Sequence, residues 1–228
     1  MSWGNVIDNL GAAFQAIGYV FSPLLLLPII YLLLPNIKYL RSFSNIFIQT
    51  IDSFSYTIGE LTKWLLPLLV LTIAFSVFAL SIFGQSWTKL FESAEYFHAI
   101  TIMLGAAATL LARQHVRVDV LHTHMNAKAR ALVDFIGFYA LLLPVCLIIL
   151  WNSQSFISFA WRIFEGSAEA DGIRGEYLLK TLIPIFTVTM IMQGLAIALR
   201  AAMCLNGQSR PSRPPHTPKF FPQQDLEH

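Results

Sequence analysis

The sequence predicts an all-α integral membrane protein with four core transmembrane helices, a further amino-terminal transmembrane helix and interfacial amphipathic helices. Hydrophobic residues make up 56% of the 228 residues and charged residues only 12%, whereas soluble domains carry about a quarter charged residues. The mean hydropathy is +0.61. Five uncharged segments also approach the length of about 20 apolar residues that a spanning helix needs. So few charges cannot cover a water-facing surface, and lipid is therefore the expected solvent.

Residues 1–63 form an amino-terminal extension with two expected helices. Residues 17–34 carry no charge and are predicted to span the membrane, although Pro23 and Pro28 lie inside the segment. Lipid-embedded helices tolerate proline where neighbouring groups satisfy the freed carbonyls. Residues 37–63 repeat an apolar residue every three or four positions, which predicts an amphipathic helix lying in the membrane interface. The charged residues that interrupt this repeat are Lys38, Arg41, Asp52 and Glu60.

Residues 64–204 form the predicted four-helix core. None of its spans contains Lys, Arg, Asp or Glu, and they are expected at 64–83, 96–112, 135–161 and 181–199. Residues 205–228 hold five prolines and no core-forming pattern, so a disordered tail is predicted there. Its last three residues, 226–228, resemble the beginning of an encoded tag and are left out of functional reasoning.

The basic residues predict an orientation. With five spans, eleven Lys and Arg residues fall on one side of the membrane and four on the other. Because positive residues accumulate in short cytoplasmic loops, the carboxyl terminus is expected in the cytoplasm and the amino terminus in the periplasm. The net charge of +2 is too small to indicate a nucleic-acid partner.

Three groups of residues are candidate interaction surfaces. Small side chains inside the second core span predict a helix-packing face, with its partner helix in this chain or another. A basic inner loop is expected to lie among lipid headgroups, where each Lys or Arg contributes about 1 kcal/mol. An acidic outer loop is long enough to meet another protein. In that order the groups are Gly105, Ala108 and Thr109; Arg113, His115, Arg117 and Asp119; and Glu165, Glu169 and Asp171.

No enzyme, cofactor or metal site is predicted. The sequence has no phosphate-binding loop, nucleophile elbow, HExxH motif or dinucleotide fingerprint. The inner histidines, His115, His122 and His124, have no established ligand spacing and no supporting cysteines. His98 is the only histidine inside a predicted span, so a haem held between facing helices would lack its second ligand.

Several short motifs resemble the DctQ-like small membrane subunit of tripartite ATP-independent periplasmic (TRAP) transporters. They are the small patch 105–107 followed by the inner-loop stretch 115–119, the acidic pair Glu92 and Glu95, and the carboxyl-terminal elements 165–167, Lys180, 183–184 and 193–194. The likeness covers roughly residues 60 to 202. About sixty residues precede the usual four-span pattern, which is a departure from that family.

The resemblance implies a function. In such transporters a large DctM-like membrane subunit carries the substrate and sodium sites, and a periplasmic solute-binding protein delivers the solute, commonly an organic acid. The small subunit braces the large one in the bacterial inner membrane and helps to dock the binding protein. The expected function is therefore scaffolding of a sodium-coupled symporter, with sodium bound by the partner subunit.

Two other functions compete with this expectation. A membrane haem or metal redox protein would use His98 and the inner histidines. A self-sufficient channel or carrier would need polar residues along its spans, and single hydroxyls in spans more often bond their own backbone. The candidate hydroxyls are Thr72, Ser76, Ser81, Thr101, Thr109, Thr187 and Thr189.

Overall fold

The structure is a computed structural model that describes residues 22–35, 37–84, 86–112 and 125–208, and these residues form helices with no strand. A 3₁₀ turn, η1 (Ser22–Leu26), leads into α2 (Leu27–Leu33). The following helices are α3 (Lys38–Thr62), α4 (Leu65–Phe83), α5 (Thr88–Leu111), α7 (Ala127–Gly137), the π-helical turn η2 (Phe138–Leu142), α8 (Leu143–Ile163) and α9 (Glu176–Leu205).

The predicted fold class is confirmed. Among the residues that the structure describes, four helical stretches are long and apolar enough to cross a membrane: Lys38–Phe83, Thr88–Leu111, Ala127–Ile163 and Glu176–Leu205. The shorter apolar helix Ser22–Leu33 precedes them. The structure describes only the second part of the predicted span 17–34, because residues 1–21 lie outside the described ranges, so its crossing of the membrane stays a prediction.

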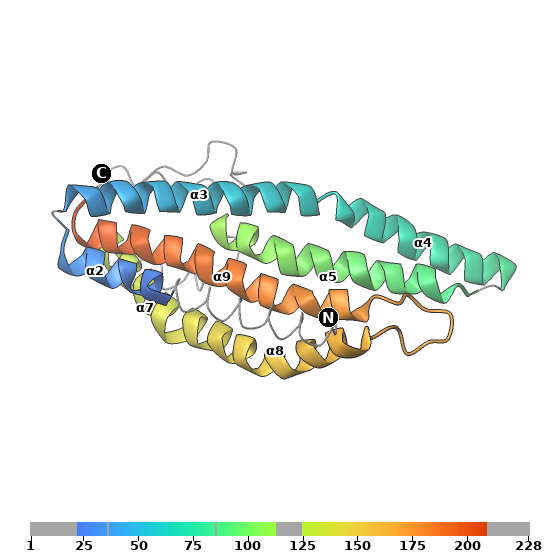
Figure 1. Cartoon of the computed structure of the whole chain (residues 1–228). Helices are drawn as coiled ribbons and strands as arrows, with labels where there is room; N and C mark the ends of the chain where they lie inside the picture. Colours follow the sequence, from blue (N-terminus) through green and yellow to red (C-terminus); the bar gives the residue numbers. More distant parts are fainter. Residues whose placement is uncertain (1–21, 36, 85, 113–124, 209–228) are drawn as a thin grey trace.

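Helix α9 lies at the centre of the bundle, and Figure 1 shows it between α3 and α8. It contacts α2, α3, α5, α7, η2 and α8. Half of the side chains in its most apolar stretch are buried within the chain, against 6% in the most apolar part of Lys38–Phe83. The bundle is therefore organised around its last helix.

Helix α3 packs along α5 and α9, although its sequence predicted a helix in the membrane interface (Figure 1). Its strong amphipathicity explains the packing: one face buries Ser44, Ile48, Ile51, Asp52 and Ser55. Hydrogen bonds from the amides of Trp64 and Leu66 carry the chain through a short turn into α4. The depth of α3 in a membrane stays a prediction.

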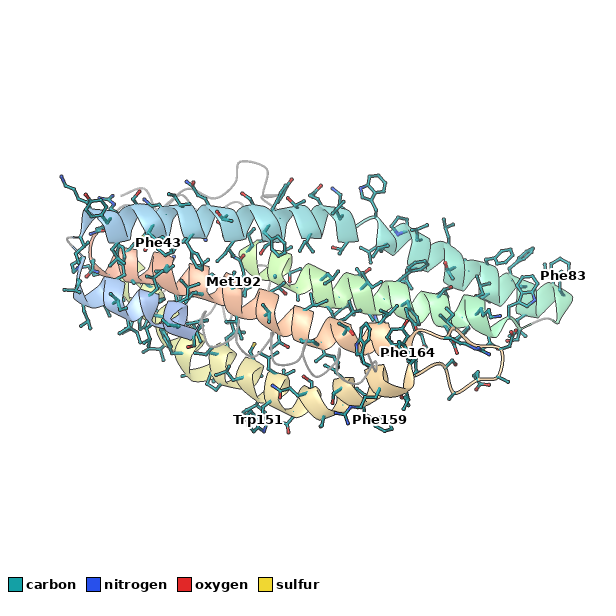
Figure 2. All side chains as sticks on the ribbon, viewed as in Figure 1. Phe43, Phe83, Trp151, Phe159, Phe164 and Met192 are labelled. Carbon is teal, nitrogen blue, oxygen red and sulfur yellow. The ribbon has the colours of Figure 1, made fainter. Side chains whose placement is uncertain are left out.

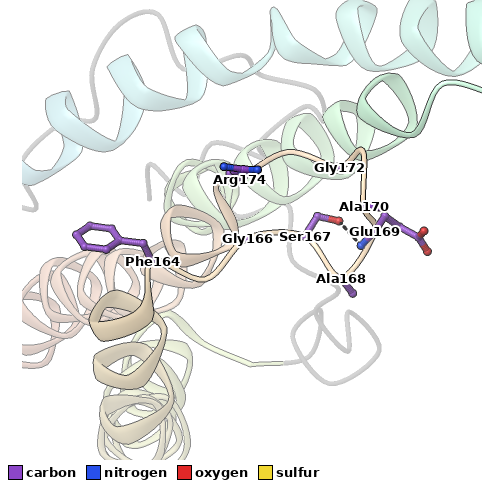
Figure 3. A pocket seen from close by; sticks show the side chains of 8 residues that line it. All are labelled: Phe164, Gly166, Ser167, Ala168, Glu169, Ala170, Gly172 and Arg174. Carbon is purple, nitrogen blue, oxygen red and sulfur yellow. Dashed lines mark hydrogen bonds between the residues drawn. The ribbon is translucent and has the colours of Figure 1, made fainter.

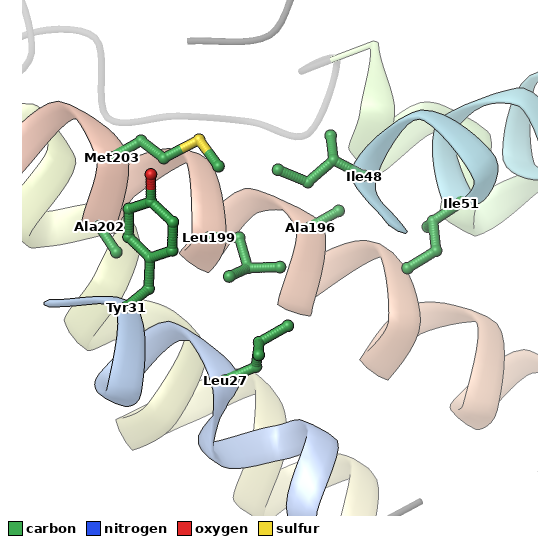
Figure 4. Close-up of a cluster of buried hydrophobic side chains, with 8 residues drawn as sticks. All are labelled: Leu27, Tyr31, Ile48, Ile51, Ala196, Leu199, Ala202 and Met203. Atoms are coloured by element: carbon green, nitrogen blue, oxygen red, sulfur yellow. The ribbon is translucent and has the colours of Figure 1, made fainter. Parts of the chain in front are cut away.

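The end of the bundle where α9 meets α2 has a compact apolar cluster. Tyr31 of α2 and Ile48 of α3 are fully buried against Leu199 and Met203 of α9 (Figure 4). The end of α9 is also tied to α2. The Asn206 amide donates to the Tyr31 carbonyl at 3.1 Å, and the Gln208 amide donates to the carbonyl of Pro35 at 2.9 Å. Residues 205–208, which were predicted to begin the tail, are thus ordered against α2.

The outside of the bundle is strongly apolar. Trp151 and Phe159 of α8 are 78% and 60% exposed, and Figure 2 shows both side chains pointing away from the other helices. Helix α4 buries only Ala79 and contacts α5 and the end of α3. A helix that is apolar on all sides requires lipid or a partner around it, so this exterior is the surface of a membrane protein.

Candidate interaction surfaces

Two of the three predicted small packing residues contact α3 of the same chain. A Cβ atom built on Gly105 would lie 3.6 Å from the Thr62 hydroxyl oxygen, and one built on Gly59 would lie 2.5 Å from the Ala108 Cβ. Thr109 is exposed instead, and its hydroxyl donates to a carbonyl of its own helix at 2.8 Å. Gly105 and Ala108 therefore pack within the chain.

The tightest position in this contact, Gly59, was absent from the sequence-based set. Its Cβ would collide with another Cβ, which has no rotamer through which to move away, so glycine allows the close approach of α3 and α5 here. A signal existed: Ser55 and Gly59 follow the small-xxx-small spacing of helix contacts. A helix lying in the membrane interface, as predicted for residues 37–63, would not make this contact.

A buried polar group joins α3 to α9. Arg200 donates from both terminal nitrogens to the two carboxylate oxygens of Asp52, at 3.2 Å for the Nη1 bond. The Gln193 amide donates to the same carboxylate at 3.1 Å, and the Ser55 hydroxyl donates to the Gln193 carbonyl at 2.7 Å. Asp52 and Gln193 are fully buried and Arg200 is 6% exposed. We call these four residues the Asp52–Arg200 group.

Sequence reasoning missed this group. In the sequence, Asp52 interrupts the apolar repeat of residues 37–63, and Arg200 follows the last predicted span. Opposite charges beside apolar segments do indicate a pair, because an unpaired charge there is costly. Nothing in the sequence, however, links two residues that are 148 positions apart.

The predicted inner-loop residues, Arg113, His115, Arg117 and Asp119, lie outside the described residues. His122 and His124 lie there too. His98 is on α5 with an exposed side chain. Within the described ranges, no three His, Cys, Asp or Glu side chains come together in a way that could hold a metal ion.

The outer loop, residues 164–175, connects α8 to α9 and carries the three predicted acidic residues in different settings. Glu165 accepts from the Lys180 ammonium at 2.5 Å, with side chains only 25% and 16% exposed. Asp171 pairs with Lys89 at 2.9 Å, and both side chains are mostly exposed. Glu169 is exposed at the tip of the loop. Glu165 therefore belongs to the framework of the loop, and Glu169 and Asp171 face solvent.

Further contacts surround the Glu165–Lys180 pair. The Lys180 nitrogen lies 4.0 Å from the centroid of the Phe156 ring, a cation–π contact. The Trp161 indole donates to the Thr181 hydroxyl at 2.9 Å, which joins the end of α8 to the start of α9. These contacts fix both ends of the loop on the bundle.

Glu92 of α5 holds the middle of the outer loop. Its carboxylate accepts from the Ser167 hydroxyl and from the Ile173 amide, the latter at 2.5 Å. The Ser167 amide donates to the Ile173 carbonyl at 3.1 Å and closes the loop upon itself. A Cβ atom built on Gly172 would lie 2.5 Å from a Glu92 carboxylate oxygen. A side chain at position 172 would therefore clash with Glu92, and glycine lets the loop approach α5 this closely.

A small hollow lies on this loop, with a volume of about 370 Å³. Figure 3 shows Ser167, Glu169 and Arg174 around it, together with Phe164 on the side of the bundle. A hydroxyl, a carboxylate and a guanidinium on one short loop can form hydrogen bonds of both polarities with another polar surface. The hollow is open to solvent and belongs to the loop alone.

The span hydroxyls are used within their own helices. Thr72 donates to the Leu68 carbonyl at 2.7 Å and Thr187 donates to the Ile183 carbonyl at 2.6 Å. The same pattern holds for Ser76, Thr101, Thr109 and Thr189. These six hydroxyls therefore satisfy backbone carbonyls, as expected for hydroxyls in spans.

Comparison with known families gives one match. The model of the family described as "Tripartite ATP-independent periplasmic transporters, DctQ component" matches residues 69–204, which is more than half of the chain. Comparisons with curated proteins and with solved structures gave no match. The matched range begins inside α4 and ends with α9, so it contains the outer loop and Glu92.

Proposed function

This chain belongs to the DctQ component family of tripartite ATP-independent periplasmic transporters, and from that premise we propose that it scaffolds a large DctM-like permease subunit. In this proposal the assembly carries out sodium-coupled uptake of an organic acid, which a periplasmic solute-binding protein delivers. The small subunit holds no sodium and no solute itself. The family is one of transporter components and not of enzymes.

The proposal is supported mainly by the hydrogen-bond partners of the chain's polar groups. Six span hydroxyls bond their own helices, and Asp52, Gln193 and the two terminal nitrogens of Arg200 are hydrogen bonded between α3 and α9. Large apolar side chains cover the outside of α4 and α8. A self-sufficient carrier needs polar groups lining a path, whereas a brace needs an apolar exterior for lipid and for a membrane partner.

The haem or metal alternative gains no support. His98 is exposed on α5, and the described helices bring together no set of ligands around it. The channel alternative is weakened because six of its candidate path-lining hydroxyls hydrogen bond to carbonyls of their own helices. Scaffolding is the function that both the family and the distribution of polar groups favour.

The proposal includes an orientation in the bacterial inner membrane. The end that holds the outer loop faces the periplasm, and the end where α9 meets α2 faces the cytoplasm. Glu169 and Asp171 then point toward the solute-binding protein. The inner-loop cations and the lysines and arginines near the cytoplasmic end lie among anionic headgroups.

Reconstitution tests the proposal. Proteoliposomes would contain this chain alone, the large membrane subunit encoded beside it alone, or both together. Solute uptake would be measured with an inward sodium gradient and the neighbouring binding protein outside. We expect uptake only with both membrane subunits, and co-purification of the two. Uptake by this chain alone, or full uptake by the large subunit without it, would refute scaffolding.

A further inference from the structure

We infer that Glu92 is a positioning residue, which holds the outer loop in the shape that meets the solute-binding protein. The inference rests on the proposed function and deepens its docking step. It starts from an asymmetry in the loop: the exposed acidic residues Glu169 and Asp171 lie on a segment whose middle is fixed by one carboxylate from a different helix.

Glu92 is hydrogen bonded to the outer loop at two points. Glu92 accepts from a side chain on the outgoing arm of the loop, Ser167, and from the backbone of the returning arm, Ile173. One carboxylate thereby bridges both arms. Hydrogen bonds to an ionised acceptor are about twice as strong as neutral ones, so this bridge and the exposed Lys89–Asp171 pair are both charge-assisted contacts between the loop and α5.

The second step is the absence of a side chain at Gly172. A Cβ there would fall within contact distance of both Ser167 and the Glu92 carboxylate. The loop therefore reaches α5 only because this residue is glycine. Glu92, Ser167 and Gly172 form one lock, which we call the loop lock.

The third step links the lock to recognition. Ser167, Glu169 and Arg174 line the hollow of about 370 Å³, and the lock sets their spacing. A partner that meets a preformed surface does not have to supply the free energy of ordering a loop. Opening the lock should therefore weaken capture of the binding protein and leave the transport step itself intact.

The test uses the assembled system with both membrane subunits. Glu92→Ala removes both acceptors. Glu92→Gln keeps both hydrogen bonds in a neutral form: its carbonyl accepts from the Ile173 amide, and its amide donates to the Ser167 hydroxyl, which can accept as well as donate. Glu95→Ala is the matched control, because Glu95 is an exposed carboxylate on the same helix with the same charge. Gly172→Ala opens the lock from the loop side.

Two measurements separate the outcomes. Hydrogen exchange of the loop peptide reports the lock, and uptake against binding-protein concentration reports docking. We expect Glu92→Ala and Gly172→Ala to speed loop exchange and to raise the apparent KM for the binding protein by about ten-fold, since the ordering cost then falls on binding. Maximal uptake should stay within about two-fold of the parent, because the sites of transport lie in the large subunit. Glu95→Ala should match the parent in both measurements, and Glu92→Gln should lie between the parent and Glu92→Ala, because its neutral hydrogen bonds are weaker than those of the carboxylate.

Each contrary result points to a different error. Unchanged exchange in Glu92→Ala would overturn the lock. Faster exchange with an unchanged KM would overturn positioning for docking, while scaffolding would stand. A Glu92→Gln variant as defective as Glu92→Ala would show that charge, and not geometry, matters. If the parent assembly gave no uptake although each component was folded, the proposed function would fail before the lock was in question.

Discussion

Asp52 and Arg200 show how two charged residues become part of a membrane bundle. A buried pair of charges contributes little net stability, because desolvation offsets the attraction, but removing one partner is costly. Here the carboxylate accepts two bonds from the guanidinium and a third from the Gln193 amide. The pair therefore specifies how α3 docks on α9 more than it adds to stability.

Replacing one partner tests this interpretation. Arg200→Met should lower the free energy of unfolding by about 3–5 kcal/mol, because the Asp52 carboxylate is left buried without its counter-charge. Thermal unfolding of the detergent-solubilised protein, followed by tryptophan fluorescence, measures the loss. The double variant Asp52→Leu/Arg200→Met should recover most of it, because apolar residues of similar volume replace buried pairs at little cost.

The control for this experiment is the pair of Lys63 and Glu60, whose side chains are 50% and 39% exposed. Exposed pairs are worth about 0–1 kcal/mol, so Lys63→Met should change the unfolding temperature only slightly. A loss in Arg200→Met as small as that in Lys63→Met would mean that the buried group does not fix α3 on α9.

At the scale of elements, the contact between α3 and α5 has room for one methyl group, which Ala108 of α5 supplies. Gly59 has no Cβ and Ala108 has one, and a second methyl has no room. Interiors are packed so closely that one extra methyl matters. The two helices are therefore complementary at this point, and the complementarity can be reversed.

We expect Gly59→Ala to destabilise the protein by about 1–3 kcal/mol through overpacking. Ala108→Gly alone should cost about 0.5–1 kcal/mol, from the flexibility of glycine in a helix. The double variant Gly59→Ala/Ala108→Gly moves the methyl from α5 to α3 and should be more stable than Gly59→Ala. A double-mutant cycle on unfolding temperatures measures the coupling.

Gly137→Ala is the matched control for helix propensity. Its Cβ would meet no atom within 4 Å, so alanine should be neutral or should stabilise by up to about 1 kcal/mol. Additive effects of Gly59→Ala and Ala108→Gly, with no coupling, would contradict the packing argument.

The helices extend beyond the uncharged segments that predict them. The sequence predicts spans at 96–112 and 181–199, whereas α5 covers Thr88–Leu111 and α9 covers Glu176–Leu205. The added turns hold charged residues such as Glu92 and Lys180, which an apolar criterion excludes. A helix does not end where the hydrocarbon does, because its backbone hydrogen bonds continue into the headgroup region. Glu92 of the loop lock and Lys180 of the Glu165 ion pair lie in those turns.

For the whole molecule, the four-span bundle follows from composition and spacing, because apolar length alone determines which segments enter lipid. The interaction surfaces follow only in part. Glu165 and Glu169 look equivalent in the sequence, yet Glu165 is paired with Lys180 and Glu169 is exposed. That distinction depends on which helices meet at the outer end, which no local pattern encodes.

Docking is therefore expected to depend on Glu169 more than on Glu165. Glu169→Lys should raise the apparent KM for the binding protein in the assembled transporter by about ten-fold. Reversing this charge would place it opposite a like charge on a partner whose surface is complementary to Glu169. The swap Glu165→Lys/Lys180→Glu keeps the ion pair and should change uptake less. Unchanged uptake in Glu169→Lys, with normal assembly, would remove Glu169 from the docking surface.

The orientation of the whole chain can be measured separately. In a variant whose two cysteines are replaced, Glu169→Cys should react with a membrane-impermeant maleimide in intact cells. Lys38→Cys should react only after the membrane is permeabilised, because α3 begins at this residue and its start lies at the opposite end of the bundle from the outer loop (Figure 1). The reverse pattern would place the outer loop in the cytoplasm and exclude contact with a periplasmic protein.

The central position of α9 has a consequence for biosynthesis. Ribosomes make this helix after the other described helices, so each of them enters the membrane before α9 exists. Asp52 leaves the ribosome 148 residues ahead of Arg200, a delay of about 7–30 s at ordinary elongation rates. During that interval the nascent chain carries an uncompensated carboxylate, and a premature stop codon before α9 would yield a fragment with nothing to assemble around. Quality-control proteases should therefore degrade such fragments but not the finished chain.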